Sequence, residues 1–214
     1  MSVILAIETS TSQGSVAILK TGGAEPAVLF AESFQAGRSH SSQLFAVLEQ
    51  ALHAVSEERI DEIAVGLGPG SYAGVRIAIS AATGLALARD ARLTGIASIA
   101  ALDRGDYVAI GDARRESFYF ALVRDGVCEQ GPELLPAGEL TSRLAALKPL
   151  PVFASEITPG MEAGLEGFGV ELRHPCAERI ARLAAEGRSI ISRDLLEPIY
   201  LRDPHITQPK APKG

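Results

Sequence analysis

The sequence predicts an α/β fold in which mixed β-sheets are covered by helices. Short apolar runs rich in β-branched residues, which are typical of buried strands, alternate with longer stretches of helical periodicity. Over about the first hundred residues the order reads as three strands, a helix, a strand and a second helix. Strands joined by short turns pair antiparallel and strand–helix–strand units pair in parallel, so a mixed sheet with packed helices follows.

The first half of the chain, residues 1–104, carries most of the clear signals. Strands are predicted at 2–9, 14–20, 27–34, 62–67 and 92–98. Residues 39–55 form one helix, because apolar side chains recur on one face and serines near its start can cap it. A second helix follows Ser71 and is apolar on almost every side, so every side of it has to be covered.

The second half, residues 105–203, reads as another set of strands and helices. Residues 106–126 predict a strand, a polar turn and a strand, and further strands are predicted at 151–155 and 169–174. Helices are predicted at 137–148 and 177–187, the latter stopped by Gly187. The tail, 204–214, holds three prolines and no apolar periodicity, so we expect it to be extended or disordered.

Composition limits the classes of function. The chain has 214 residues, of which 47% are hydrophobic and 21% charged, as in an ordinary globular protein. Its net charge of −6 argues against direct binding to a nucleic-acid backbone. Its two cysteines, Cys128 and Cys176, form no C-x-x-C motif, and its four histidines do not pair at metal-ligand spacing. No apolar segment reaches the roughly 20 residues of a membrane span, and no signal peptide is recognised. We expect a cytoplasmic protein without a metal site.

The segment GLGPGSYAG, residues 66–74, allows three interpretations. A nucleophile elbow requires G-x-S-x-G, but Pro69 and Ala73 flank Ser71 at those positions. A glycine-rich helix start can bind phosphate, although the P-loop lysine and the dinucleotide glycine pattern are both missing. The third interpretation is a tight turn in which glycines permit unusual backbone angles, and the pattern alone favours it.

Several motifs in order resemble one family. AIETSTSQGSVAIL, HSSQL, GLGPGSYAGVRIAISAATGLALA, DARRESFYFAL and PIYLRD follow one another at characteristic spacing. Together they resemble the TsaB (YeaZ) family, bacterial accessory proteins for making threonylcarbamoyladenosine in tRNA. The resemblance covers residues 1–125 and the YLR near the end. It implies two ribonuclease-H-like halves of the actin, Hsp70 and sugar-kinase superfamily.

The resemblance also implies a function and partners. Members bind and activate a TsaD-like transferase, together with a TsaE-like ATPase, for modifying the adenosine next to the anticodon in tRNAs reading codons that start with A. Alone they form homodimers, and tRNA is reached only through the complex. The resemblance implies a non-catalytic subunit with no cofactor of its own, with ATP or ADP bound in the assembled complex. Ser98 and Leu102 stand where TsaD-like relatives carry their metal-binding histidine pair.

Two sets of candidate residues follow from the family. The partner would contact the two N-terminal helices through Leu44, Leu48, Ala51, Leu52, Val75, Ile79 and Ala82. A vestigial nucleotide site would use Glu8, Thr9, Ser10, Gly68, Gly70, Ser71 and Asp112. The alternative function is an ATPase or transferase that works in a cleft lined by Glu8, Asp112 and the loop Gly68–Ser71. Arg114 and Arg115, on a polar turn, are candidates for touching tRNA in the complex.

Overall fold

The computed structural model describes residues 1–35, 40–113, 117–193 and 195–201, and in this part of the chain the strands form two sheets. The first sheet has the strand order β11-β5-β4-β1-β2-β3. Its strands are β1 (Val3–Glu8), β2 (Gln13–Lys20), β3 (Ala27–Gln35), β4 (Glu62–Gly66), β5 (Arg92–Ile96) and β11 (Ile190–Ser192). β1 pairs antiparallel with β2 and parallel with β4, so the predicted mixed sheet is confirmed.

The second sheet repeats the opening hairpin of the first. Its order is β10-β9-β6-β7-β8, with β6 and β7 antiparallel and β6 and β9 parallel. The strands are β6 (Tyr107–Asp112), β7 (Ser117–Arg124), β8 (Val127–Pro136), β9 (Val152–Ala154) and β10 (Glu171–Leu172). The first strand of each sheet therefore ends in a carboxylate, Glu8 in β1 and Asp112 in β6.

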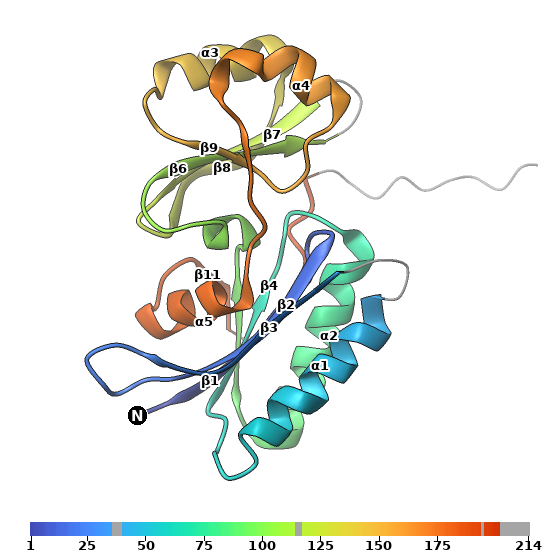
Figure 1. Ribbon diagram of the computed structural model, residues 1–214, viewed down its shortest axis with the longest axis vertical. Helices are drawn as coiled ribbons and strands as arrows, with labels where there is room; N and C mark the ends of the chain where they lie inside the picture. The colour runs from blue at the N-terminus through green and yellow to red at the C-terminus, as the bar shows by residue number, and fades with distance from the viewer. Residues whose placement is uncertain (36–39, 114–116, 194, 202–214) are drawn as a thin grey trace, which may run out of the picture.

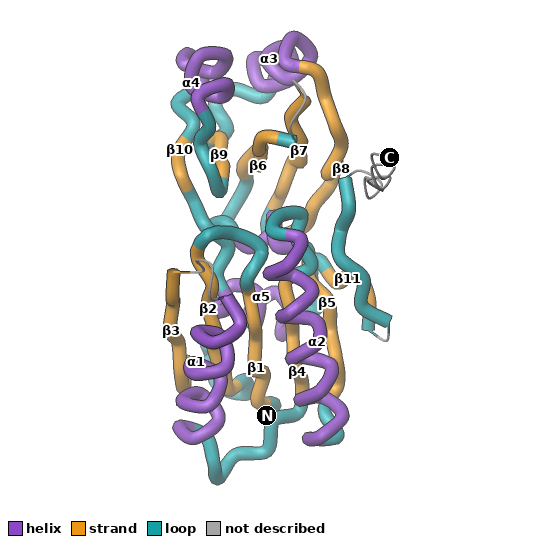
Figure 2. Tube along the Cα trace, turned by 90° about the vertical axis from the view of Figure 1, so that its right-hand side faces the viewer, coloured by secondary structure: helices purple, strands orange, loops and turns teal. Residues whose placement is uncertain are grey.

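Helices cover the sheets in layers. Figure 2 shows α1 (His40–Ala54) and α2 (Tyr72–Arg89) side by side over one face of the first sheet. The short helix η1 (Ser98–Ala101) and α5 (Ala177–Glu186) lie between the two sheets (Figure 1). The outer face of the second sheet is covered by α3 (Ala137–Ala146) and α4 (Pro159–Leu165), and the short helix η2 (Glu166–Phe168) follows α4.

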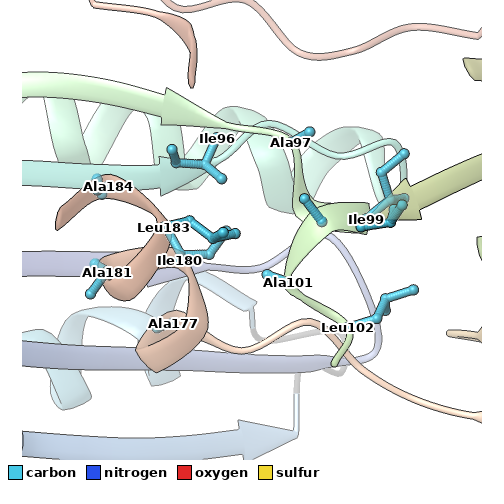
Figure 3. Packing of buried hydrophobic residues seen from close by; sticks show 14 of the residues in the cluster. Ile96, Ala97, Ile99, Ala101, Leu102, Ala177, Ile180, Ala181, Leu183 and Ala184 are labelled. Carbon is cyan, nitrogen blue, oxygen red and sulfur yellow. The ribbon is translucent and has the colours of Figure 1, made fainter. Parts of the chain in front are cut away.

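The largest core joins the two sheets. Ile180 and Leu183 of α5 are fully buried and lie beside Ile96 and the residues of η1 (Figure 3). The same cluster includes Tyr107 and Ala109 of β6, so side chains from both sheets are removed from water together. This shared core fixes the strand ends of the two sheets relative to one another.

Two strands of the second half, β8 and β11, were not among the predicted elements, whereas the helix predicted at 177–187 is found as α5. β8 carries Glu129, Gln130 and Pro132, and it forms because it is an edge strand that pairs only with β7 in the sheet order. Both α5 and β11 come late in the sequence but are associated with the first sheet. The helix α5 packs on this sheet, and β11 extends its edge. The sheets therefore do not follow chain order, and the boundaries 1–104 and 105–203 stay a prediction. The tail 204–214 lies outside the described residues.

The caps of α2 explain where this helix begins and ends. Ser71 is the N-cap, and its Oγ accepts a hydrogen bond from the Gly74 N–H at 3.2 Å. Asp90 closes the helix in the left-handed conformation, with φ of 51°, and its N–H donates to the carbonyl of Ala86. Among the described residues, no helix has the length and apolar character needed to cross a membrane.

Candidate functional site

The loop between β4 and α2 is bound to its neighbours by backbone hydrogen bonds. The N–H of Ser71 donates to the carbonyl of Ser10 at 2.6 Å, which joins the loop to the turn after β1. The carbonyl of Gly68 accepts from the Ser98 N–H at 2.9 Å, and the Gly68 N–H donates to the Ser98 Oγ at 2.9 Å. These contacts support the tight-turn interpretation of the segment.

Glycine is required in this loop for close approach between chain segments. A Cβ at Gly70 would lie 2.0 Å from the carbonyl oxygen of Ser10. A Cβ at Gly66 would lie 1.8 Å from Oε2 of Glu8. Both distances are far below any normal contact, so side chains at these positions would separate β4 and its loop from the turn after β1.

Glu8 is completely buried at the end of β1. Its Oε1 accepts a hydrogen bond from the Ser10 N–H at 2.5 Å, and its Oε2 accepts from the Ser98 hydroxyl at 2.7 Å. Burial raises the pKa of the Glu8 carboxyl, and the hydrogen bonds from Ser10 and Ser98 oppose that shift without overcoming it. Glu8 thus ties β1 to η1 from inside the protein.

The raised pKa predicts a pH dependence that glutamine should remove. The folded state holds the Glu8 proton more tightly than the unfolded chain, so this group lowers stability as pH rises from its ordinary pKa of 4.5 to its higher folded value. Over that range, wild-type stability should fall relative to Glu8→Gln, by at most about 1.4 kcal/mol per pH unit for one proton. Urea unfolding of both proteins at several pH values measures the difference. A difference that does not change with pH would contradict the prediction.

A cleft of about 730 Å³ lies between the two sheets above this buried carboxyl. Its walls come from the turn after β1, the start of α2, and the ends of β6 and β9. The lining residues are Ser10, Thr11, Ser12, Pro69, Gly70, Ser71, Tyr72, Gly111, Asp112, Tyr119, Ser155 and Glu156. Four predicted nucleotide-site residues are among them, namely Ser10, Gly70, Ser71 and Asp112.

The other three predicted nucleotide-site residues do not line this cleft. Glu8 and Thr9 are 0% and 1% exposed, and the Thr9 hydroxyl donates to the carbonyl of Gly74 at 2.8 Å. Gly68 is buried, and its N–H and carbonyl both form hydrogen bonds with Ser98. The expectation of a cleft lined by Glu8 is therefore corrected. The Glu8 side chain turns into the protein interior, where it accepts a hydrogen bond from Ser98.

The described lining of the cleft is polar and acidic. Asp112 and Glu156 supply carboxylates, five Ser and Thr residues supply hydroxyls, and no Lys, Arg or His is found among the described lining residues. Burial raises the pKa of Tyr119 to about 12, so its hydroxyl stays protonated near neutral pH. By themselves these groups do not fit a nucleoside triphosphate, because the two carboxylates would repel its negative charge. The described residues also form no group of three metal-ligating side chains.

The predicted partner-binding residues lie mostly inside the chain. Five of the seven are no more than 5% exposed, namely Leu44, Leu48, Ala51, Val75 and Ala82. Leu52 and Ile79 are half-buried. The expectation of a contact surface made from all seven is corrected, because the helices bury these side chains against the first sheet.

The outer side of α1 and α2 carries an apolar surface that shares Leu48 and Leu52 with the predicted set and that we call the α1/α2 groove. It has a volume of about 290 Å³ and is lined by Phe45, Leu48, Glu49, Leu52, Ala81 and Leu85. Phe45 is 54% exposed, which is unusual for a large aromatic side chain. Residues 45, 49 and 52 have the spacing of one helix face, but the sequence did not show which face of α1 packs on the sheet.

A glycine on α2 lies beside the groove. Gly84 is exposed in the middle of the helix, and a Cβ added to it would meet no atom within 4 Å. A mid-helix glycine costs about 1 kcal/mol relative to alanine. Packing within this chain therefore gives no reason for glycine at this position.

Ser98 and Leu102 are both engaged in the interior. Ser98 donates to Glu8, and Leu102 is 7% exposed in the core around η1. Neither position belongs to a group of three or more metal-ligating side chains among the described residues. Arg114 and Arg115, which were candidates for contact with tRNA, lie outside the described residues.

Comparison with known families identifies the chain. The family model described as "TsaD: tRNA N6-adenosine threonylcarbamoyltransferase" matches residues 15–152, more than half of the sequence. The chain belongs to the TsaD family. The match spans the end of the first β-hairpin, the loop before α2 and most of the second sheet, so it includes the cleft-lining residues of that loop and of β6 and β7.

Relatives within the TsaD family confirm the resemblance to TsaB. The tRNA threonylcarbamoyladenosine biosynthesis protein TsaB of Escherichia coli is 29% identical, with 94% of each chain covered. TsaB of Haemophilus influenzae is 29% identical over 65% of this chain and 61% of its own length. An uncharacterised protein of Mycobacterium leprae is 31% identical over 62% of this chain, which spans only 38% of that protein.

Two solved structures support the fold. YeaZ from Pseudomonas aeruginosa superposes with a TM-score of 0.68 at 24% identity, covering 94% of this chain and all of that one. A second structure, described as similar to peptidase YEAZ from the same organism, gives a TM-score of 0.70 with the same coverage. The predicted α/β fold with two ribonuclease-H-like halves is confirmed.

Proposed function

We propose that this chain is an accessory scaffold in the biosynthesis of threonylcarbamoyladenosine in tRNA. The observation that carries the proposal is the α1/α2 groove, an apolar surface with an open glycine beside it. Exposed apolar grooves of this kind mark docking sites for an amphipathic helix. Phe45 supplies an aromatic anchor, and Gly84 lets a partner helix approach the α2 backbone closely.

The partner is a TsaD-like transferase. Support comes from family membership, because two related proteins with the same helix pair can pack four helices into one bundle. Two of the relatives are named as TsaB proteins of tRNA threonylcarbamoyladenosine biosynthesis. In our proposal a TsaE-like ATPase joins the pair, tRNA is reached through the complex, and the chain alone forms a homodimer through the same groove.

We assign this chain no chemical step. Support comes from Ser98 and Leu102 at the positions of the metal-binding histidine pair, since leucine has no lone pair for a metal. The acidic and hydroxyl-rich cleft also lacks a cationic side chain among its described residues. ATP or ADP in the assembled complex is then held mainly by the partners.

The experiment that tests the scaffold is size-exclusion chromatography with light scattering, alone and with the TsaD-like protein of the same organism. We expect a homodimer that is replaced by a one-to-one heterodimer. Phe45→Glu places a charge in the groove and should weaken the heterodimer by about 30-fold or more, as loss of an interface hot spot does. Gly84→Leu should act in the same direction by filling the space above α2.

The control is Leu172→Glu, the same kind of change at a residue that is 50% exposed on the edge of the second sheet. It should leave heterodimer formation unchanged. In cells that lack the chromosomal copy, Phe45→Glu should fail to restore the tRNA modification while Leu172→Glu restores it. Full modification in the absence of this protein would overturn the proposal.

A nucleotide-cleaving enzyme is the second candidate, favoured by the size of the cleft and by Asp112 in its wall. Purified protein without partners should then hydrolyse ATP, and Asp112→Asn should abolish turnover. Phe45→Glu would leave that activity unchanged, which separates this candidate from the scaffold.

A further inference from the structure

Two tyrosines that are far apart in the sequence, Tyr72 and Tyr200, meet at the start of α2. Tyr72 is the first residue of α2, and Tyr200 lies in the C-terminal segment that runs past it. The ring centroids are 5.5 Å apart, with an angle of 33° between the planes. The two residues are 52% and 46% exposed, so a large aromatic area faces solvent.

Arg76, one turn further along α2, completes this group. Its guanidinium carbon lies 5.1 Å from the centroid of the Tyr72 ring, and its Nη1 donates to the Tyr72 hydroxyl at 2.6 Å. We call Tyr72, Arg76 and Tyr200 the tyrosine platform. Its three members are held by one another, so little side-chain entropy remains to be lost when a ligand binds.

The C-terminal segment that carries Tyr200 is fixed to the first sheet. The N–H of Ile199 donates to the carbonyl of Leu67 at 2.8 Å. Leu196 is 8% exposed and packs with Leu67 over Gly95. The backbone before Tyr200 is therefore anchored at two points, and the position of the ring is set by the fold.

The surroundings of the platform differ from those of the α1/α2 groove. Tyr72 lines the cleft, and beside it are the hydroxyl-bearing residues Ser71, Ser10, Thr11 and Ser12. Aromatic rings with a guanidinium and neighbouring hydroxyls are the groups that stack unpaired bases and hydrogen-bond to ribose and phosphate. The groove, in contrast, is lined by aliphatic side chains, one phenylalanine and one glutamate, as protein-binding surfaces are.

We propose that the tyrosine platform stacks unpaired bases of an RNA loop, so that this chain touches RNA directly in the modification complex. The choice of RNA as ligand rests on the proposed function. The cleft carboxylates, Asp112 and Glu156, come from the second sheet, on the wall opposite the platform. Because they repel phosphate, the sugar–phosphate backbone of the RNA lies outside the cleft, near Arg76. With one guanidinium, binding is modest and depends weakly on salt.

Tyrosine fluorescence provides a direct test. The chain has no tryptophan, and of its four tyrosines Tyr107 and Tyr119 are no more than 8% exposed, so Tyr72 and Tyr200 present most of the ring area that a base can quench. The probe is an RNA hairpin with a seven-base unpaired loop, compared with the same stem closed by a four-base loop. We expect quenching by the first hairpin, and fluorescence anisotropy of labelled hairpin gives the affinity of the chain and of its heterodimer.

Variants identify the residues responsible. Tyr72→Leu and Tyr200→Leu keep apolar area but remove the ring, and each should weaken binding by about 5- to 100-fold. Tyr200→Phe should bind like the wild type, because stacking needs the ring alone. Arg76→Gln should lower the slope of log affinity against log salt by about one. Leu195→Ala, at a residue 74% exposed in the same segment, is the control that should change nothing.

Three results would overturn the proposal. They are the absence of hairpin binding by both chain and heterodimer, equal affinity in the leucine variants, or loss of heterodimer in those variants with RNA affinity retained. The last result would make the platform a protein contact. Phe45→Glu separates this proposal from the scaffold, since it should weaken the heterodimer while the chain still binds the hairpin.

Discussion

Gly74→Ala should destabilise the protein by about 2 kcal/mol, whereas Gly84→Ala in the same helix should stabilise it. The substitution is identical and both residues lie in α2, so intrinsic helix propensity favours alanine at each by about 1 kcal/mol. The difference comes entirely from what a methyl group would meet at each position.

At Gly74 the methyl group would collide with the backbone. Its Cβ would lie 2.2 Å from the carbonyl oxygen of Thr9, and Thr9 is 1% exposed with its hydroxyl bonded to the Gly74 carbonyl. Relief of the clash would move the first turn of α2 away from β1, and such overpacking costs about 1–3 kcal/mol. The same movement would disturb the wall of the cleft.

At Gly84 nothing lies within 4 Å of the added methyl group, so the expected gain is about 0.5–1 kcal/mol. Urea unfolding followed by circular dichroism measures both variants against the wild type. Equal effects at the two positions would contradict the argument. A gain in stability at Gly84 together with weaker heterodimer formation would support a partner contact over this residue.

Glu8→Ala should have a second large effect, a loss of about 3 kcal/mol. Removal of the carboxyl leaves the Ser10 N–H and the Ser98 hydroxyl without their acceptor in a fully buried place, and it also leaves a cavity. Glu8→Gln, which keeps the volume and one acceptor oxygen, should lose less than half as much. The measurement is again urea unfolding at neutral pH.

The matched control for Glu8 is Glu25→Ala, the same substitution at an exposed residue of the loop before β3. It should change stability by less than about 0.5 kcal/mol. If Glu8→Ala unfolds at the same urea concentration as Glu25→Ala, the buried carboxyl does not tie β1 to η1, and our description of the loop would need revision.

Part of the candidate site could be predicted from the sequence. Ser10, Gly70, Ser71 and Asp112 were expected near one another because of the family resemblance, and they line the cleft. Glu8 was expected to line it as well. The sequence showed a carboxylate at the end of β1, but only the packing showed Ser98 close enough to draw it inward.

The partner surface illustrates the same limit. Periodicity correctly predicted α1 and α2, yet five of the seven residues chosen for the interface are buried against the first sheet. The apolar face predicted for α1 did not include Phe45, and α2 is apolar on almost every side, so periodicity could not decide which residues stay exposed. Phe45 and Leu85 became candidates only when the exposed side was known.

The sequence by itself determined the fold class, the two helices, the mixed sheet and the resemblance to TsaB, because apolar periodicity and local turn chemistry act over a few residues. Tertiary structure alone decided that β11 extends the first sheet and α5 packs on it, that β8 forms the edge of the second, and that Tyr72 meets Tyr200. These features join segments far apart in the chain. Their stability comes from shared burial and cross-strand hydrogen bonds, which no local pattern of residues records.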